Sequence, residues 1–206
     1  ALAAVSPAAA AVDIAMGPSA DPELQLVTIT GRIERGDAQR VQQFLATLPK
    51  ERQIAVSLHS PGGLIDEALR MGRHFHANKI RTYVTGKGRE CASACALAFL
   101  GGRDGDGSTF RVKGSGAKLG YHGFRRIVQE KEFTVADMHE AIATTQRVLL
   151  SIADYLTSVD ADIEFMSMML ETPNGSMSYL DDYKALKIGV HVLDEANTML
   201  RAPQAR

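Results

Sequence analysis

Short apolar runs alternate along the chain with longer segments whose apolar residues have helical spacing, from residue 24 onward. The short runs predict buried strands at residues 24–30, 54–58, 80–85, 109–112, 118–121 and 190–193. Intervals of three and four between apolar residues predict helices at residues 37–49 (capped by Asp37), 64–75, 94–100, 135–156, 160–170 and 183–188. This alternation predicts an α/β fold with a mostly parallel sheet covered by helices.

The 206 residues, of which 45% are hydrophobic, are enough for one core. Residues 1–22, rich in alanine and proline, predict a flexible leader, residues 23–197 a single domain, and residues 198–206 a flexible tail. The leader resembles sequence that follows a secretory cleavage site. We therefore expect a periplasmic or secreted protein. The alternative is that residues 1–22 are part of a disordered leader unrelated to secretion, in which case we expect a cytoplasmic protein.

Composition excludes several classes of function. The net charge is −1 and there is no run of lysine and arginine, so a nucleic-acid partner is not expected. No apolar run approaches the roughly 18 residues that span a bilayer, so no membrane span is expected. Two cysteines do not complete a tetrahedral zinc set, and no cofactor motif is present. We therefore expect neither a metal nor a cofactor.

The segment 91–95 (CASAC) directly precedes an apolar helix and contains Ser93. Small neighbours allow a substrate backbone to approach this serine, and the free N–H groups at the start of a helix favour an oxyanion. The segments 60–63 (SPGG) and 120–123 (GYHG) add glycines and a histidine, the groups that acyl transfer needs. Taken singly, these features also fit a structural serine, a turn and a buried core histidine.

The order of these segments resembles the Clp protease proteolytic subunit over roughly residues 27–193. The run 91–102 is similar to predicted periplasmic or secreted Clp-protease-like proteins of bacteria. The resemblance implies the fold shared by Clp proteases and crotonases, a spiral of ββα units with a protruding long helix that serves oligomer contacts. It also implies a serine endopeptidase acting on a peptide or protein substrate.

Carried over by position, the resemblance makes Ser93 the nucleophile and His122 the base that takes its proton. The backbone N–H groups of Gly63 and Ala94 would then form the oxyanion hole. Glycine suits such a donor because it allows unusual φ values and a close approach of the substrate.

The third catalytic residue departs from the family pattern. Counting back from the last short helix places Met177 where Clp-type subunits have an acid. Asp181, or alternatively Asp182, lies close in sequence, and Glu171 is a weaker candidate. These aspartates also fit a role as caps of the next helix. The sequence is thus compatible with a dyad, with a triad whose acid is shifted, or with a catalytically degenerate scaffold.

The two cysteines flank Ser93 at a spacing of four. On a continuous helix this spacing lies near the upper limit for a disulfide, whereas a bend before Ser93 would bring the cysteines closer. In an oxidising compartment such a bridge would brace the nucleophile turn. The alternative is two small buried thiols that fill space.

The long helix at residues 135–156 carries an apolar stripe that predicts a homo-oligomer: Met138, Ile142, Leu149, Ile152 and Leu156. The alternative is that this stripe completes the protomer's own core. An ATP-driven unfoldase partner is not expected for an exported protein. Other functions left open are a crotonase-type acyl-thioester enzyme, a non-catalytic binding scaffold, and a Ser–Lys protease with Lys87 or Lys118 as base.

Overall fold

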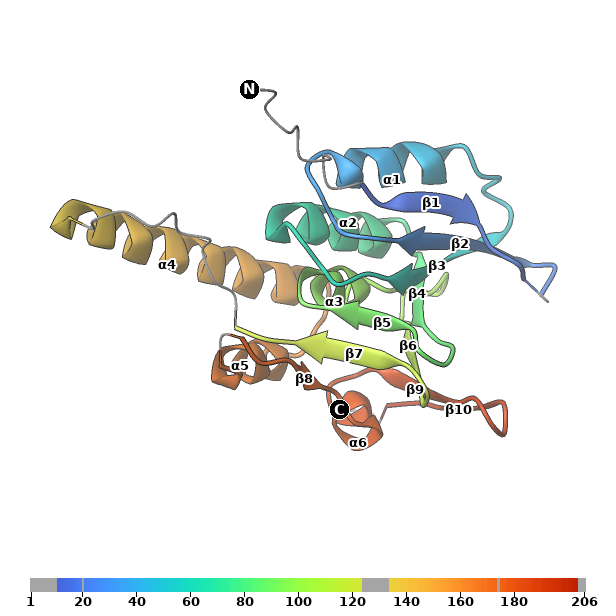
Figure 1. The fold of residues 1–206 in the computed structure, drawn as a ribbon. Helices are drawn as coiled ribbons and strands as arrows, with labels where there is room; N and C mark the ends of the chain where they lie inside the picture. Colours follow the sequence, from blue (N-terminus) through green and yellow to red (C-terminus); the bar gives the residue numbers. More distant parts are fainter. Residues whose placement is uncertain (1–10, 20, 124–133, 174, 204–206) are drawn as a thin grey trace, which may run out of the picture.

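The computed structural model describes residues 11–19, 21–123, 134–173 and 175–203. Its largest element is a seven-stranded sheet with the order β1-β2-β3-β4-β6-β9-β10 (Figure 1). The strand bounds are β1 Asp13–Met16, β2 Leu24–Thr30, β3 Gln53–His59, β4 Arg81–Val84, β6 Arg111–Gly114, β9 His191–Asp194 and β10 Met199–Arg201. The inner strands run parallel and the two edge strands antiparallel to their neighbours. This confirms the predicted mostly parallel sheet.

Burial along the strands follows their place in the sheet. In β2, the buried residues Val27 and Ile29 alternate with half-buried ones. In β3, the consecutive residues 55–58 are all buried, as expected for a strand covered on both faces. The core therefore lies around β3. The segment that follows β3 is thus attached to a strand that is buried on both faces.

A second, three-stranded sheet has the order β5-β7-β8, with bounds Glu90–Ala92, Lys118–Tyr121 and Ser178–Tyr179. β5 and β7 are parallel, and β8 is antiparallel to β7. A bridge between Ser60 and Cys91 joins this sheet to the residue after β3. The carboxyl ends of β3, β5 and β7 therefore come together at the junction of the two sheets.

The helices cover these sheets. Their bounds are α1 Asp37–Ala46, α2 Ile65–Ala77, α3 Ala94–Phe99, α4 Val135–Ser158, α5 Glu164–Glu171 and α6 Asp182–Lys187. α2 packs against both α1 and α3. Of the described residues, no helix is long and apolar enough to cross a membrane.

Two segments that the sequence predicted to be flexible contain strands. Asp13–Met16, within the predicted leader, pairs with β2, and Met199–Arg201, within the predicted tail, pairs with β9. Val12 is buried as well, and its N–H donates to the carboxylate of Asp37 at 3.2 Å. These parts of the predicted leader and tail therefore belong to the folded domain. Residues 1–10 and 204–206 lie outside the described residues.

Asp37 does not act as the predicted N-cap. Gly36 occupies that position, and Asp37 is the first residue of α1, with its carboxylate fully buried. This carboxylate accepts the N–H of Glu34 at 2.7 Å and forms an ion pair with Arg40. Since it also accepts the N–H of Val12, Asp37 ties the N-terminal strand to α1.

Other boundaries differ by a few residues. The strand predicted at 109–112 begins instead at Arg111, and the helix predicted at 160–170 begins at Glu164. The N–H of Glu164 donates to the carboxylate of Asp162 at 2.8 Å, which fixes the start of α5.

The helix α4 projects from the body of the molecule (Figure 1). Its outer part exposes Val135, Met138 and Ile142, whose exposed fractions are 69%, 56% and 51%. Its inner part is fully buried at Ile152, Tyr155 and Leu156. The Tyr155 hydroxyl donates to the backbone oxygen of Leu97 in α3 at 2.6 Å. The inner end of the stripe thus completes the protomer's own core, while the outer end remains exposed.

Candidate active site

Three segments from the carboxyl ends of β3, β5 and β7 line one cleft. The segment after β3 contributes Gly63, the residue after β5 is Ser93, and the residue after β7 is His122. The cleft has a volume of about 970 Å³. The structure therefore brings together the predicted nucleophile, the predicted base and one of the two predicted oxyanion donors.

Ser93 sits in a tight turn between β5 and α3. Its φ of 56° and ψ of −124° are rarely adopted by a residue other than glycine. Such a conformation costs about 1–3 kcal/mol and persists only where the surroundings enforce it. The N–H of Ser93 donates to the backbone oxygen of Gly120 at 3.0 Å, which links the turn to β7. Its hydroxyl has no hydrogen-bond partner among the described residues.

The turn after β3 packs directly against Ser93. Gly62 has a φ of 94°, and a Cβ at this position would lie 2.8 Å from the Cβ of Ser93 and 2.9 Å from the nitrogen of Ala94. Only glycine therefore fits there. The hydroxyl of the buried Ser60 accepts the N–H of Gly62 at 3.0 Å, which holds the turn in place. This positioning role of Ser60 was missed in the sequence, where Ser-Pro-Gly-Gly carries no sign of it.

The two predicted oxyanion donors are unused. Gly62 and Leu64, on either side of Gly63, are bonded to the backbone of Ile33 at 2.9 Å each. The N–H groups of Gly63 and Ala94, in contrast, donate to no acceptor among the described residues. Gly62 lies against the nitrogen of Ala94, so the segments that carry these two N–H groups are in contact beside Ser93.

His122 directly follows β7, and its Nδ1 lies 2.6 Å from the backbone oxygen of Gly123. A carbonyl oxygen only accepts, so Nδ1 carries the proton in this contact, and Nε2 is left with its lone pair. Nε2 is then the nitrogen able to take a proton. Of the carboxylates that the structure describes, none is hydrogen-bonded to His122. No sequence signal pointed to the Gly123 carbonyl, because every residue type carries one.

The acid candidates have other partners. Asp181 caps α6, with its carboxylate accepting the N–H of Lys184 at 2.7 Å. Asp182 forms ion pairs with Lys113 at 3.0 Å and Arg201 at 2.8 Å. Asp181 is thus a helix cap, as the capping alternative states, whereas Asp182 is the first residue of α6 and is held by ion pairs.

The charges of Asp181 and Glu171 affect the pKa of Tyr121. Burial raises the pKa of the Tyr121 hydroxyl, and the negative charges of Asp181 and then Glu171 raise it further.

Met177 lies beside the site at the place that the sequence count predicted for the acid. Gly120 pairs with Tyr179 and Tyr121 with Ser178, so the next step of this register sets Met177 opposite His122. A Cβ on Gly120 would lie 3.0 Å from the Met177 sulfur. The residue that this register sets beside His122 is therefore a methionine rather than an acid.

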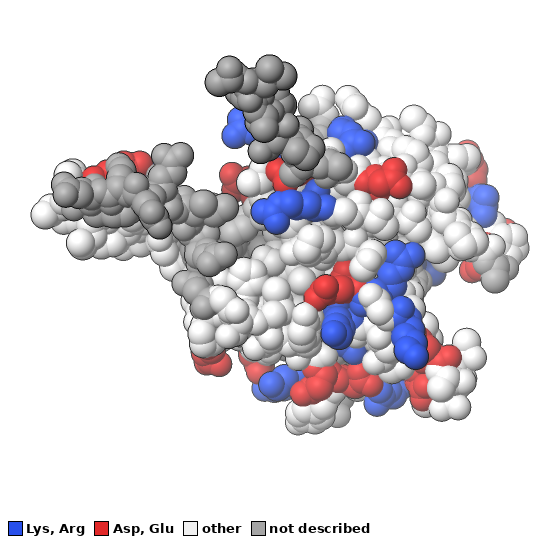
Figure 2. Space-filling model, in the orientation of Figure 1, with Lys and Arg blue, Asp and Glu red and all other residues white. Residues whose placement is uncertain are grey.

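The walls of the cleft mix apolar and charged side chains. The apolar ones are Leu64, Ile65 and Val148, and the charged ones are Arg32, Arg35, Asp66, Glu67 and Arg70. Glu67 is buried, accepts the N–H of Ala38 at 2.9 Å and pairs with Arg70. Figure 2 shows acidic and basic side chains interspersed over the visible face. The cleft therefore does not belong to a surface of one charge.

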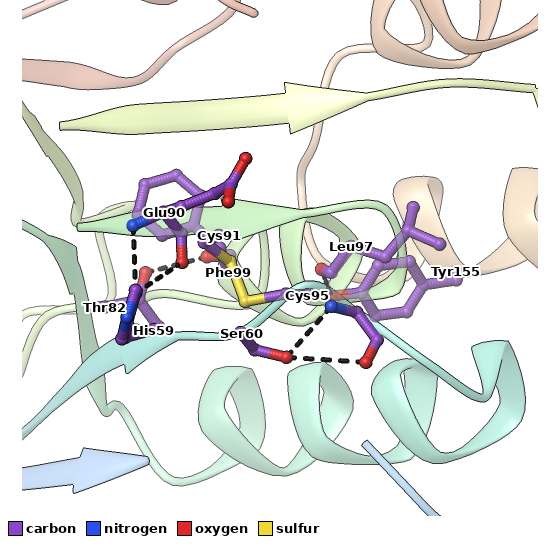
Figure 3. Close-up of a disulfide and its surroundings, with 10 residues drawn as sticks. His59, Ser60, Thr82, Glu90, Cys91, Cys95, Leu97, Phe99 and Tyr155 are labelled. Atoms are coloured by element: carbon purple, nitrogen blue, oxygen red, sulfur yellow. Dashed lines mark hydrogen bonds between the residues drawn. A yellow bond between two sulfur atoms is a disulfide. The ribbon is translucent and has the colours of Figure 1, made fainter. Parts of the chain in front are cut away.

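Cys91 and Cys95 form a disulfide across the Ser93 turn (Figure 3). Their Cα atoms are 5.2 Å apart, because Cys91 lies within β5 and Cys95 is the second residue of α3, with the tight turn at Ser93 between them. Of the two alternatives left open by the sequence, the bridge is thus the one observed.

The lysines considered as alternative bases lie elsewhere. Neither Lys87 nor Lys118 lines the cleft that contains Ser93. Lys118 is at the opposite end of β7 from His122, and its ammonium group lies 5.2 Å from the centre of the Tyr179 ring. A Ser–Lys arrangement with either lysine is therefore not assembled in this structure.

No protein-family model matches the chain, and a comparison with curated protein sequences gave no match. Among solved structures, a mutant form of the 1510-N membrane-bound stomatin-specific protease is similar, with a TM-score of 0.56 and 18% sequence identity. The match covers 82% of this chain and 79% of that chain. At this identity the likeness shows the fold alone. The chain has the Clp-protease-like α/β fold that the sequence predicted.

Proposed function

We propose that this chain is a serine peptidase of the Clp type, with Ser93 as nucleophile and His122 as base. The observation that carries the proposal is the meeting of Ser93, His122 and Gly63 in one cleft, from three strand ends. The strained Ser93 turn, beside two unused N–H groups, adds support because strain of this kind clusters at functional sites. A neighbour of the same fold that is a protease agrees with it.

In the proposed reaction, the Ser93 oxygen attacks the carbonyl carbon of a peptide bond while His122 Nε2 takes the hydroxyl proton. The N–H groups of Gly63 and Ala94 stabilise the resulting oxyanion. His122 then gives the proton to the leaving amine, and the C–N bond breaks to leave an acyl-enzyme. Water, deprotonated by His122, hydrolyses this ester and restores Ser93.

The Gly123 carbonyl takes over the orienting role of the missing acid. By accepting from Nδ1, it holds the tautomer in which Nε2 is the base. A carbonyl does not stabilise the imidazolium ion as a carboxylate does, so we expect a dyad with a modest turnover rate.

A fluorophosphonate probe on the wild-type protein tests the proposal, with the modified residue identified by mass spectrometry. We expect one adduct, on Ser93. His122→Gln should slow labelling at least about a hundredfold, since general bases contribute about that much or more. Lys118→Ala is the matched control and should label at the wild-type rate. Labelling that depends on Lys118 but not on His122 would favour the Ser–Lys alternative.

A non-catalytic scaffold is the second candidate, and Met177 beside His122 is the observation that favours it. A folded wild-type protein that does not react with the probe, and hydrolyses neither peptides nor esters, would support this candidate over the peptidase.

We also propose that the protein works in an oxidising compartment, the periplasm or the extracellular space. The Cys91–Cys95 disulfide supports this, because disulfides persist in such compartments and are rare in the cytosol.

We further propose that the outer part of α4 binds a second copy of the chain. The exposed residues Val135, Met138 and Ile142 continue the stripe that is buried farther along the same helix, and such a patch is normally covered. Light scattering at tens of micromolar should give an oligomer for the wild type. Met138→Glu with Ile142→Glu should give a folded monomer, whereas Ala136→Glu with Ala143→Glu, which adds the same charge at exposed positions on the side of α4 away from Met138 and Ile142, should not. A monomeric wild type would contradict the proposal.

A further inference from the structure

The disulfide joins the two elements between which Ser93 turns. Cys91 lies in β5, where it pairs with Leu119 of β7 and bridges to Ser60, and Cys95 is the second residue of α3. Figure 3 shows the bridge directly above the Ser60 turn. Both cysteines are fully buried, and the chain holds no other cysteine. One covalent link therefore spans the segment that carries the nucleophile.

The far half of α3 has its own anchors. The Thr82 hydroxyl donates to the backbone oxygen of Phe99 at 2.7 Å, and the Tyr155 hydroxyl donates to that of Leu97 at 2.6 Å (Figure 3). These bonds fix the end of the helix away from Ser93. They do not fix the distance between the end of β5 and the first turn of α3.

At the Ser93 end, Gly62 packs against the turn and the N–H of Ala92 donates to the backbone oxygen of Ser60 at 3.0 Å. The N–H of Ser93 is bonded to Gly120, and the N–H of Ala96 to the backbone oxygen of Ser93, each at 3.0 Å. A residue in such a conformation keeps it only when its surroundings over-determine it. The disulfide supplies the additional constraint, because it fixes the separation of Cys91 and Cys95 on either side of the turn.

The length of the loop that the disulfide closes indicates whether the bond mainly affects global stability or local geometry. The two cysteines are only four positions apart, and so short a loop restricts the unfolded chain less than almost any other disulfide. The main consequence of the bond is therefore local geometry rather than global stability.

We infer that Cys91 and Cys95 are positioning residues for acyl transfer: their disulfide holds the Ser93 oxygen and the Ala94 N–H where the reaction needs them. This inference rests on the proposed function. The oxidised protein is the competent form. The bond forms by exchange with a disulfide of a partner oxidant: the two cysteine thiols lose two electrons and two protons, and the partner leaves as two thiols.

Burial of both sulfurs keeps reductants away from the bond in the folded protein. The test therefore uses substitutions rather than a reducing agent. The Cys91→Ala, Cys95→Ala double variant removes the bond, and Cys95→Ser breaks it with little change of volume, in case the double variant does not fold. Val41→Ala, at a fully buried site in α1 away from the cleft, is the control for a general loss of packing.

The first measurement is kinetic, with an ester substrate and with the fluorophosphonate probe. In the bridge variants we expect kcat and the labelling rate to fall about a hundredfold, the loss typical of a misplaced catalytic group, with KM within threefold of wild type. Val41→Ala should lower the melting temperature but leave kcat within threefold. Equal kcat and labelling in wild type and bridge variants would overturn the inference.

The second measurement is amide hydrogen exchange of the segment 90–96, which needs no activity. Faster exchange confined to this segment in the bridge variants supports the inference, and unchanged exchange overturns it. A wild-type protein that does not react with the probe would refute the proposed function alone, and exchange would then decide whether the disulfide holds the turn.

Discussion

Replacing Ser93 with alanine is expected to abolish hydrolysis of peptides and esters while leaving the fold intact. Loss of the nucleophile typically removes several powers of ten in rate, so kcat should fall by at least about four powers of ten. The fold should survive because the Ser93 hydroxyl has no hydrogen-bond partner among the described residues, and alanine leaves no buried group unsatisfied. Steady-state kinetics and the melting temperature of the purified variant measure both parts.

Ser151→Ala is the matched control, since it removes an exposed hydroxyl on α4 from a residue that does not line the cleft. It should retain full turnover. Unchanged turnover in Ser93→Ala would show that another group is the nucleophile, and a large drop in its melting temperature would show that Ser93 has a structural role.

Replacing Met177 with aspartate is expected to raise kcat about a hundredfold. The register of β7 and β8, continued by one residue, sets residue 177 opposite His122, so we expect a carboxylate there to reach the imidazole, whose one hydrogen bond among the described residues is to Gly123. In serine triads the loss of this carboxylate costs about four powers of ten, and a newly introduced one should recover part of that factor. Initial rates of ester hydrolysis at pH 7 to 8 measure the gain.

Met177→Asn, which matches aspartate in shape without the charge, should give no more than a few-fold change. Asp181→Asn and Asp182→Asn should also stay within a few-fold, because both carboxylates have partners at α6. A drop of a thousandfold or more in either variant would identify that aspartate as the catalytic acid, and the dyad would be wrong.

The fold could be predicted where a segment carries its own periodicity. The strands at Leu24–Thr30 and Lys118–Tyr121 have the predicted bounds. Their own apolar residues mark them as strands, whichever strands they pair with in the sheet. The strands Asp13–Met16 and Met199–Arg201 were missed, because as short edge strands they are defined by the neighbour to which they bond rather than by a hydrophobic pattern.

The position of the candidate site in the fold could be predicted in part, from residue types and strand ends. Ser93, His122 and Gly63 stand out by residue type, and parallel strand ends brought them into one cleft. The Gly123 carbonyl leaves no mark in a sequence, since it is a backbone group. The disulfide stayed undecided because its geometry depends on the break between β5 and α3 at Ser93, which a small-residue run does not reveal.

The division of the strands into two sheets has a mechanical consequence. Ser93 and His122 follow strands of the smaller sheet, and the Ala94 N–H moves with them, whereas Gly63 follows β3 of the larger sheet. The segment after β3 is tied to β5 by the bridge between Ser60 and Cys91 and by the N–H of Ala92, which donates to the backbone oxygen of Ser60 at 3.0 Å. The backbone that carries Gly63 therefore keeps its place relative to Ser93 through contacts between the two sheets. In the proposed mechanism, a substitution that loosens this junction would weaken stabilisation of the oxyanion, while Ser93 and His122, which follow strands of one sheet, would keep their relative positions.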